Sequence, residues 1–300
     1  YFFVIAALLY WKRPAKAKTE LNEHFFGAFR AGLRYVKASR ELHRVLLRAA
    51  MYFAFASAIW ALLPLVARTM LNGTAGFYGL LLGAVGGGAI AGALLLPRLR
   101  SKLSNDGLML LSAVLSALVM LALAMSPPQW LALLLMLVLG VGWIIALTTL
   151  NGVAQAVLPD WVRGRGLAVY LMVFNGTLAG GSLAWGLIAQ QLGLATTLLI
   201  AGAGLVLSAV LLKRLALPAG EADLQPAQHW AAPVVHEEVD VRRGPVLIQI
   251  RYRVPQEDRA AFKRAIHKSA QSRRRDGVYA WGLMAQTDDP TALLACFMVE

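Results

Sequence analysis

Residues 131–150 read LALLLMLVLGVGWIIALTTL, and none of these twenty side chains carries a charge. A helix of that length rises about 30 Å, which matches the hydrocarbon thickness of a bilayer. A lone strand would leave its backbone groups unpaired in lipid, so a helix is the expected conformation. Five further blocks of similar length and character occupy residues 45–66, 76–96, 107–125, 167–190 and 194–212. The sequence therefore predicts an all-α polytopic membrane protein with six spans between residues 45 and 214.

The composition agrees with this class. Hydrophobic residues make up 58% of the chain, charged residues only 15%, and the mean hydropathy is +0.60. A soluble domain carries about 25% charged residues. The net charge of +13 raises the question of nucleic acid, but the basic residues lie between apolar blocks and in the tail, without an aromatic-basic surface. We therefore expect a lipid bilayer as surroundings and no nucleic-acid partner. The single cysteine, Cys296, excludes a cysteine-based metal cluster, and we expect no metal and no cofactor.

Lysine and arginine gather on alternate connecting segments. The connections on one side carry a single arginine, Arg68. Those on the other side are the basic segment 12–44 and the segments with Arg98, Arg100 and Lys102, with Arg163 and Arg165, and with Lys213 and Arg214. Basic residues stay on the cytoplasmic side during insertion, so segment 12–44 and the C-terminus are predicted to be cytoplasmic.

The beginning of the chain is predicted to belong to a longer protein. Residues 1–11 are apolar but too few to cross a bilayer, and they lack the features of a signal peptide. We expect them to end a transmembrane helix whose beginning is absent. Within the loop 12–44, an amphipathic helix is expected over 23–44. It lies either on the anionic inner leaflet or against the helices as a linker.

The plan of a long basic connection followed by six spans with short loops can be compared with known families. The stretches that sharpen the comparison are LLPLVAR (62–68), GLLLGA (79–84), LLPRLR (95–100), and NGVAQ (151–155) continuing through PDWVRGR (159–165). Residues 1–214 resemble the major facilitator superfamily from its sixth helix onward, in the bacterial branch of enterobactin-exporter-like proteins and transmembrane secretion effectors. The resemblance implies a bacterial inner-membrane transporter that works by alternating access and lacks here its N-terminal six-helix half.

One loop departs from that pattern. The loop between the eighth and ninth helices often carries Gly-x-x-x-Asp-Arg, but here Gly92 is followed by Leu96 at the acidic position. Another acid, in the next cytoplasmic loop, could close the inner side by pairing with an arginine. The predicted cytoplasmic gate consists of Arg98, Arg100, Asp160 and Arg163. The alternative is that these arginines only follow the charge rule for membrane topology.

Two predicted spans carry glycines four residues apart, a spacing that lets helix backbones approach closely. They are Gly79, Gly83 and Gly87 in one span and Gly176 and Gly180 in the other. The resemblance places them on the eighth and eleventh helices, which pack and slide against the opposite half. Static packing is the alternative.

The middle of each span lacks Asp, Glu and Lys, and Arg48 lies one turn inside its span, from which it can extend to the cytoplasmic interface. A proton-coupling acid is therefore expected in the N-terminal half, unless coupling does not use a carboxylate. The resemblance implies a cavity lined by the seventh and tenth helices, and the predicted substrate-contact residues are Tyr52, Trp60, Trp143, Thr148 and Asn175. The alternative for the aromatic residues is anchoring at the membrane interface.

The tail has a different composition. Residues 215–245 form a proline-containing, charged linker, and residues 246–300 show a β-α-β-β pattern. This pattern resembles part of a ferredoxin-like, dimeric α+β-barrel domain of the antibiotic-biosynthesis-monooxygenase type. The resemblance implies that the chain continues beyond residue 300 and that the domain forms a homodimer or acts in gating.

The predicted function is proton-coupled export of a small amphipathic molecule, such as a siderophore or a drug-like compound, without catalytic residues. An ATPase signature is absent from the sequence, so an ion gradient is the expected energy source. Two alternatives remain at this point. One is an importer of the same fold, and the other is a membrane-anchored enzyme whose C-terminal domain carries a monooxygenase-like activity.

Overall fold

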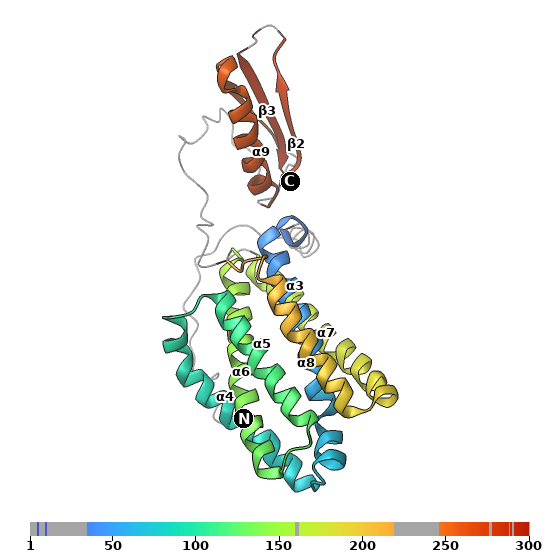
Figure 1. Ribbon diagram of the computed structural model, residues 1–300. Helices are drawn as coiled ribbons and strands as arrows, with labels where there is room; N and C mark the ends of the chain where they lie inside the picture. Colours follow the sequence, from blue (N-terminus) through green and yellow to red (C-terminus); the bar gives the residue numbers. More distant parts are fainter. Residues whose placement is uncertain are drawn as a thin grey trace.

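The computed structural model describes residues 5, 10, 35–159, 162–218, 246–275, 278–287, 289 and 291–299. Within them, six helices are long and apolar enough to cross a membrane, and a small sheet follows (Figure 1). These helices are α3 (Arg40–Leu65, continued by the π-helical turn η1, Val66–Met70), α4 (Ala75–Arg100), α5 (Asn105–Ala124), α6 (Gln129–Ala156), α7 (Arg163–Leu192) and α8 (Leu194–Leu212). The predicted class of polytopic helical membrane protein is confirmed.

The helices begin at residues suited to that position. Ser39, Thr74 and Ser104 each accept a hydrogen bond from a backbone N–H in the first turn of α3, α4 and α5. Between α7 and α8 the chain turns at Gly193, whose φ of 80° favours glycine. Several helices extend beyond the apolar blocks, because helical turns continue where the residues become polar. For example, α4 runs through Pro97 to Arg100.

The six helices form neighbouring pairs. The closest pairings are α4 with α6, α3 with α7, and α5 with both α6 and α8 (Figure 1). Glycine permits the closest approach: a Cβ on Gly140 of α6 would overlap the backbone of α4, and one on Gly88 of α4 would overlap the backbone at Leu137. In contrast, α7 buries the smallest share of its apolar length, followed by α4. These two helices therefore have the largest faces without a partner among the described helices.

The small sheet follows residues 219–245. Its elements are β1 (Val246–Arg253), the 3₁₀ turn η2 (Gln256–Asp258), α9 (Arg259–Arg275), β2 (Val278–Ala285) and β3 (Ala292–Val299). They occur in the order expected from the sequence. The strands are arranged β1-β3-β2, and both outer strands are antiparallel to β3.

The two faces of this sheet differ. Leu293, Ala295 and Phe297 alternate along β3 and are buried on one side of the sheet. The helix α9 covers that side, and its Ile266 and Ala270 are buried as well. On the opposite side, Leu247 is 51% exposed and Met284 57%. This second side also carries the exposed Arg251 and Arg253 of β1, so it is mixed in character, and no described helix covers it.

Candidate functional site

Four aromatic rings meet where α3 approaches α6 and α7. Phe53 of α3 lies 4.5 Å from Phe174 of α7 and 5.5 Å from Trp143 of α6, measured between ring centroids. Trp60, two turns further along α3, lies 5.0 Å from Trp143. All these contacts are edge-to-face, the geometry that aromatic quadrupoles prefer. We call Phe53, Trp60, Trp143 and Phe174 the aromatic cluster.

Some polar atoms on the three helices that form the cluster lack partners. The indole nitrogen of Trp60, the hydroxyl of Thr149 on α6 and the hydroxyl of Tyr170 on α7 are all buried without a hydrogen bond among the described residues. Tyr170 lies one helical turn before Phe174. Leaving a buried polar group unpaired costs about 1–3 kcal/mol, so a ligand or a further helix that pairs with these atoms would recover that free energy. Of these three side chains, Trp60 belongs to the aromatic cluster itself.

Tyr52 lies next to the cluster, but its hydroxyl is satisfied. The side chain is buried, and its hydroxyl lies 2.7 Å from Ser112 Oγ and 3.3 Å from Ser116 Oγ on α5. Ser112 donates its proton to the carbonyl of Gly142 at 2.6 Å, so the Tyr52 hydroxyl donates to Ser112. This contact joins α3, α5 and α6. It gives Tyr52 a packing role and does not favour the prediction that it lines a cavity.

The two other predicted substrate-contact residues bond along their own helices. The Thr148 hydroxyl donates to the Ile144 carbonyl at 2.6 Å, and the Asn175 amide donates to the Leu171 carbonyl at 2.8 Å. Thr148 is half-buried and Asn175 is exposed. Of the five predicted residues, the structure brings only Trp60 and Trp143 into contact with each other.

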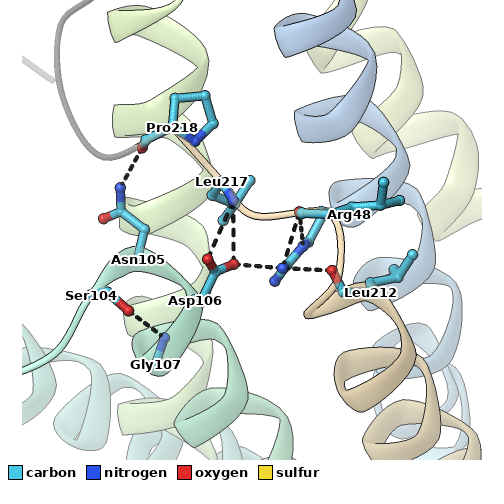
Figure 2. Close-up of polar contacts among 9 residues, drawn as sticks. Arg48, Ser104, Asn105, Asp106, Gly107, Leu212, Leu217 and Pro218 are labelled. Carbon is cyan, nitrogen blue, oxygen red and sulfur yellow. Dashed lines mark hydrogen bonds and ion pairs between the residues drawn. The ribbon is translucent and has the colours of Figure 1, made fainter.

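A second polar site lies where α3, α5 and the end of α8 meet (Figure 2). Arg48 Nη2 of α3 lies 2.5 Å from Asp106 Oδ1 of α5 and donates to the carbonyl of Leu212 at 2.7 Å. The same guanidinium donates to the carbonyl of Leu215 at 3.2–3.3 Å. The Leu217 N–H donates to both carboxylate oxygens of Asp106 at 3.3 Å. We call this arrangement the Arg48–Asp106 clasp.

The clasp holds the chain that leaves α8. Asn105, next to Asp106, also donates to the carbonyl of Pro218 at 2.9 Å. The Arg48 side chain is only 4% exposed and that of Asp106 19%. A charge removed from water to this extent is stable only when it is paired and hydrogen-bonded, and here both conditions hold. The segment between Leu212 and Pro218 is therefore fixed to α3 and α5.

This site corrects an expectation from the sequence. The sequence allows Arg48 to extend to the interface, but its side chain is buried and points to Asp106, because a counter-charge and the carbonyls of Leu212 and Leu215 lie within reach. One feature of the sequence points to this ion pair. Asp106 is the acid in the first turn of its span, at the same end of the helices as Arg48. Sequence alone does not show that α3 and α5 are neighbours.

The comparisons with known proteins identify the family. A family model described as a transmembrane secretion effector, of the major facilitator superfamily, matches residues 1–300. The chain belongs to this family. No curated protein and no solved structure matches it. The family match makes the chain a membrane transporter, and because it continues through residues 246–299, the small sheet lies inside the region that the family shares.

The predicted glycines of this facilitator face away from its own helices. Gly79 and Gly83 have nothing within 4 Å of an added Cβ, and the same holds for Gly176 and Gly180. Gly87 would only touch the Leu137 side chain at 3.4 Å. Neighbouring glycines make the internal contacts instead: Gly88 and Gly92 of α4 against α6, and Gly181 of α7 against α3. The predicted set therefore lies on the open faces of α4 and α7.

The predicted gate of the facilitator is described in part. Arg98 and Arg100 are exposed at the end of α4, and Arg100 donates to the carbonyl of Thr148 at 3.4 Å. Arg163 donates to the carbonyl of Leu158 at 3.4 Å. Asp160 lies outside the described residues, so its pairing with an arginine stays a prediction.

Proposed function

We propose that this facilitator exports a small amphipathic molecule, such as a siderophore or a drug-like compound, across a bacterial inner membrane by alternating access. The observation that carries the proposal is the aromatic cluster, with its unpaired indole nitrogen on Trp60. Indole rings offer broad apolar contact together with one hydrogen-bond donor, which suits a substrate that has both kinds of surface.

The proposal includes a second helical half. The open faces of α4 and α7, with Gly83 and Gly180 at their surfaces, are flat enough for another pair of helices to approach closely. We propose that the N-terminal six helices pack there, so that the aromatic cluster faces a cavity between the halves. Opening and closing of that cavity would then involve sliding at these glycines.

The orientation and the energy source are part of the same proposal. Arg98, Arg100, Arg163 and Lys213 lie at one end of the helices, which we call the basic end, and we place that end in the cytoplasm. In the described parts of the six spans, the only carboxylates are Glu41 and Asp106, both at this end. We therefore place the proton-coupling acid in the N-terminal half.

For the tail we propose a regulatory or assembly role in a ferredoxin-like domain. The strand order β1-β3-β2, with α9 connecting the two outer strands across one face, supports this fold. The exposed apolar side chains of Leu247 and Met284 on the uncovered side support pairing with a second copy. Enzymatic activity in the tail is not needed to account for these features.

The experiment uses the full-length protein in an efflux-deficient bacterial strain. Accumulation of a fluorescent amphipathic dye and of a labelled siderophore is followed with and without a protonophore. The proposal predicts lower accumulation of at least one compound, restored when the proton gradient collapses. Unchanged accumulation of both in cells with verified membrane insertion contradicts it, and increased accumulation favours an importer.

A further inference from the structure

Within the tail, the helix α9 has charged residues of one sign only. This helix contains seven lysines and arginines and no acidic residue. Its apolar side packs against the sheet, where Ile266 and Ala270 are buried and Phe262 contacts Tyr252 at 5.1 Å between ring centroids. On the outer side, Lys263, Arg264 and Lys268 are exposed. We call these three residues the cationic face.

The spacing of these residues makes them one surface. Arg264 and Lys268 are four residues apart and lie on one side of the helix, with Ala261 next to Lys268 in angle and Lys263 about 100° around from Arg264. Of the acids that flank the helix in the sequence, Glu257 and Asp258 precede it, where they complement its positive N-terminus, and Asp276 follows it outside the described residues. The helix α9 therefore contains no acidic residue of its own that would neutralise the cationic face.

The clasp determines where this surface is held. Arg48, Asp106 and Asn105 fix the chain up to Pro218 at the basic end of the helices (Figure 2). Residues 219–245 number 27, so the start of the small sheet at Val246 stays within about 95 Å of that end even when the chain is fully extended. A tethered surface of this kind meets the adjacent leaflet at a high effective concentration.

We propose that the cationic face of α9 docks on the anionic phospholipid headgroups of the leaflet at the basic end. The inference goes beyond the proposed transport and uses only the proposed cytoplasmic placement of that end, because the inner leaflet is anionic. The two rings of α9, Phe262 and His267, each contact a ring of the sheet, Tyr252 and Trp281, at 5.1 Å between centroids, so they are not presented together for the base stacking that a single-stranded nucleic acid uses. Headgroups need only positive charge, and each lysine or arginine near the surface strengthens binding about 5-fold.

The test uses the full 300-residue chain in nanodiscs, which expose both leaflets and need no transport. Cys296, the only cysteine, is changed to Ala, and Ala261→Cys places an environment-sensitive fluorophore on the outer side of α9. Discs of pure phosphatidylcholine are compared with discs that contain phosphatidylglycerol. The proposal predicts a shift to an interfacial signal only in the anionic discs, lost at high salt because exposed charges are then screened.

A pair of charge-matched variants decides the assignment. The double change Arg264→Gln with Lys268→Gln should lower the ratio of docked to free α9 about 30-fold. The control Arg251→Gln with Arg253→Gln removes two exposed cations from β1 and should leave the ratio nearly unchanged. Equal signals in neutral and anionic discs, or equal effects of the two variants, would overturn the proposal. So would a salt-sensitive protected signal in neutral discs, which would identify the acidic residues of 219–245 as the partner.

Discussion

Removal of the Arg48 guanidinium should destabilise the helices more than the removal of any exposed arginine. In Arg48→Met, Asp106 loses its counter-charge, and the carbonyls of Leu212 and Leu215 lose their donor. Breaking a buried ion pair from one side costs about 3–5 kcal/mol. Asp106 is 19% exposed, so water solvates it in part and we expect the lower end, about 3 kcal/mol.

The measurement is thermal unfolding of the detergent-solubilised protein, followed by tryptophan fluorescence. At 2–4 °C per kcal/mol for a chain of this size, Arg48→Met should lower Tm by roughly 6–12 °C. The matched control is Arg44→Met, one turn earlier on the same helix and exposed, with an expected change of about 0.5 kcal/mol or less.

A double-mutant cycle with Asp106→Asn separates the pair from other effects. Because each single change leaves the other partner buried, the double variant should be destabilised by clearly less than the sum of the two singles, by about 1–3 kcal/mol. If Arg48→Met melted at the same temperature as Arg44→Met, or if the two singles were additive, the reasoning on the clasp would be refuted.

Three further outcomes are expected. Gly140→Val should prevent folding, because its side chain would overlap the backbone of α4. In contrast, Gly83→Val should fold normally but impair transport in the full-length protein. An unfolding assay and a transport assay distinguish the two effects. Tyr52→Phe should lower stability by about 1 kcal/mol through the lost hydrogen bond to α5, and an unchanged Tm would contradict a stabilising role of this bond. The Thr291 hydroxyl and N–H lower the pKa of Asp289, so its contribution to stability is present above the pKa of the unfolded chain and is lost as pH falls through the folded pKa. Thr291→Ala should raise that pKa toward the usual Asp range, as measured by NMR titration.

The helical class was predictable from the sequence because the apolar blocks are as long as a bilayer is thick. Helix ends were less predictable, since α4 stays helical through Pro97 to Arg100 where the composition becomes polar. Periodicity also does not reveal which side of a helix meets a neighbour. Gly83 and Gly88 lie on adjacent stripes, and only Gly88 makes an internal contact.

For the candidate site, too, the sequence predicted some contacts and not others. Trp60 and Trp143 were selected because the resemblance implies a cavity between their helices, and the structure places the two rings in contact. Tyr52 was selected on the same grounds, but a serine on α5 takes up its hydroxyl. The Arg48–Asp106 pair joins two helices whose proximity is a property of the tertiary packing, so no local pattern in the sequence predicts it.

On the proposed function, the aromatic cluster contacts the substrate of an exporter. The most direct measurement is transport and equilibrium binding of one identified substrate by the full-length protein in proteoliposomes, with Trp143→Leu compared against Trp130→Leu. Trp130 lies on the same helix but is 64% exposed near its other end. We expect Trp143→Leu to weaken binding about 3- to 10-fold, because an aromatic contact is lost, while Trp130→Leu binds like the unchanged protein. Equal affinities for both variants, at equal stability, would contradict it.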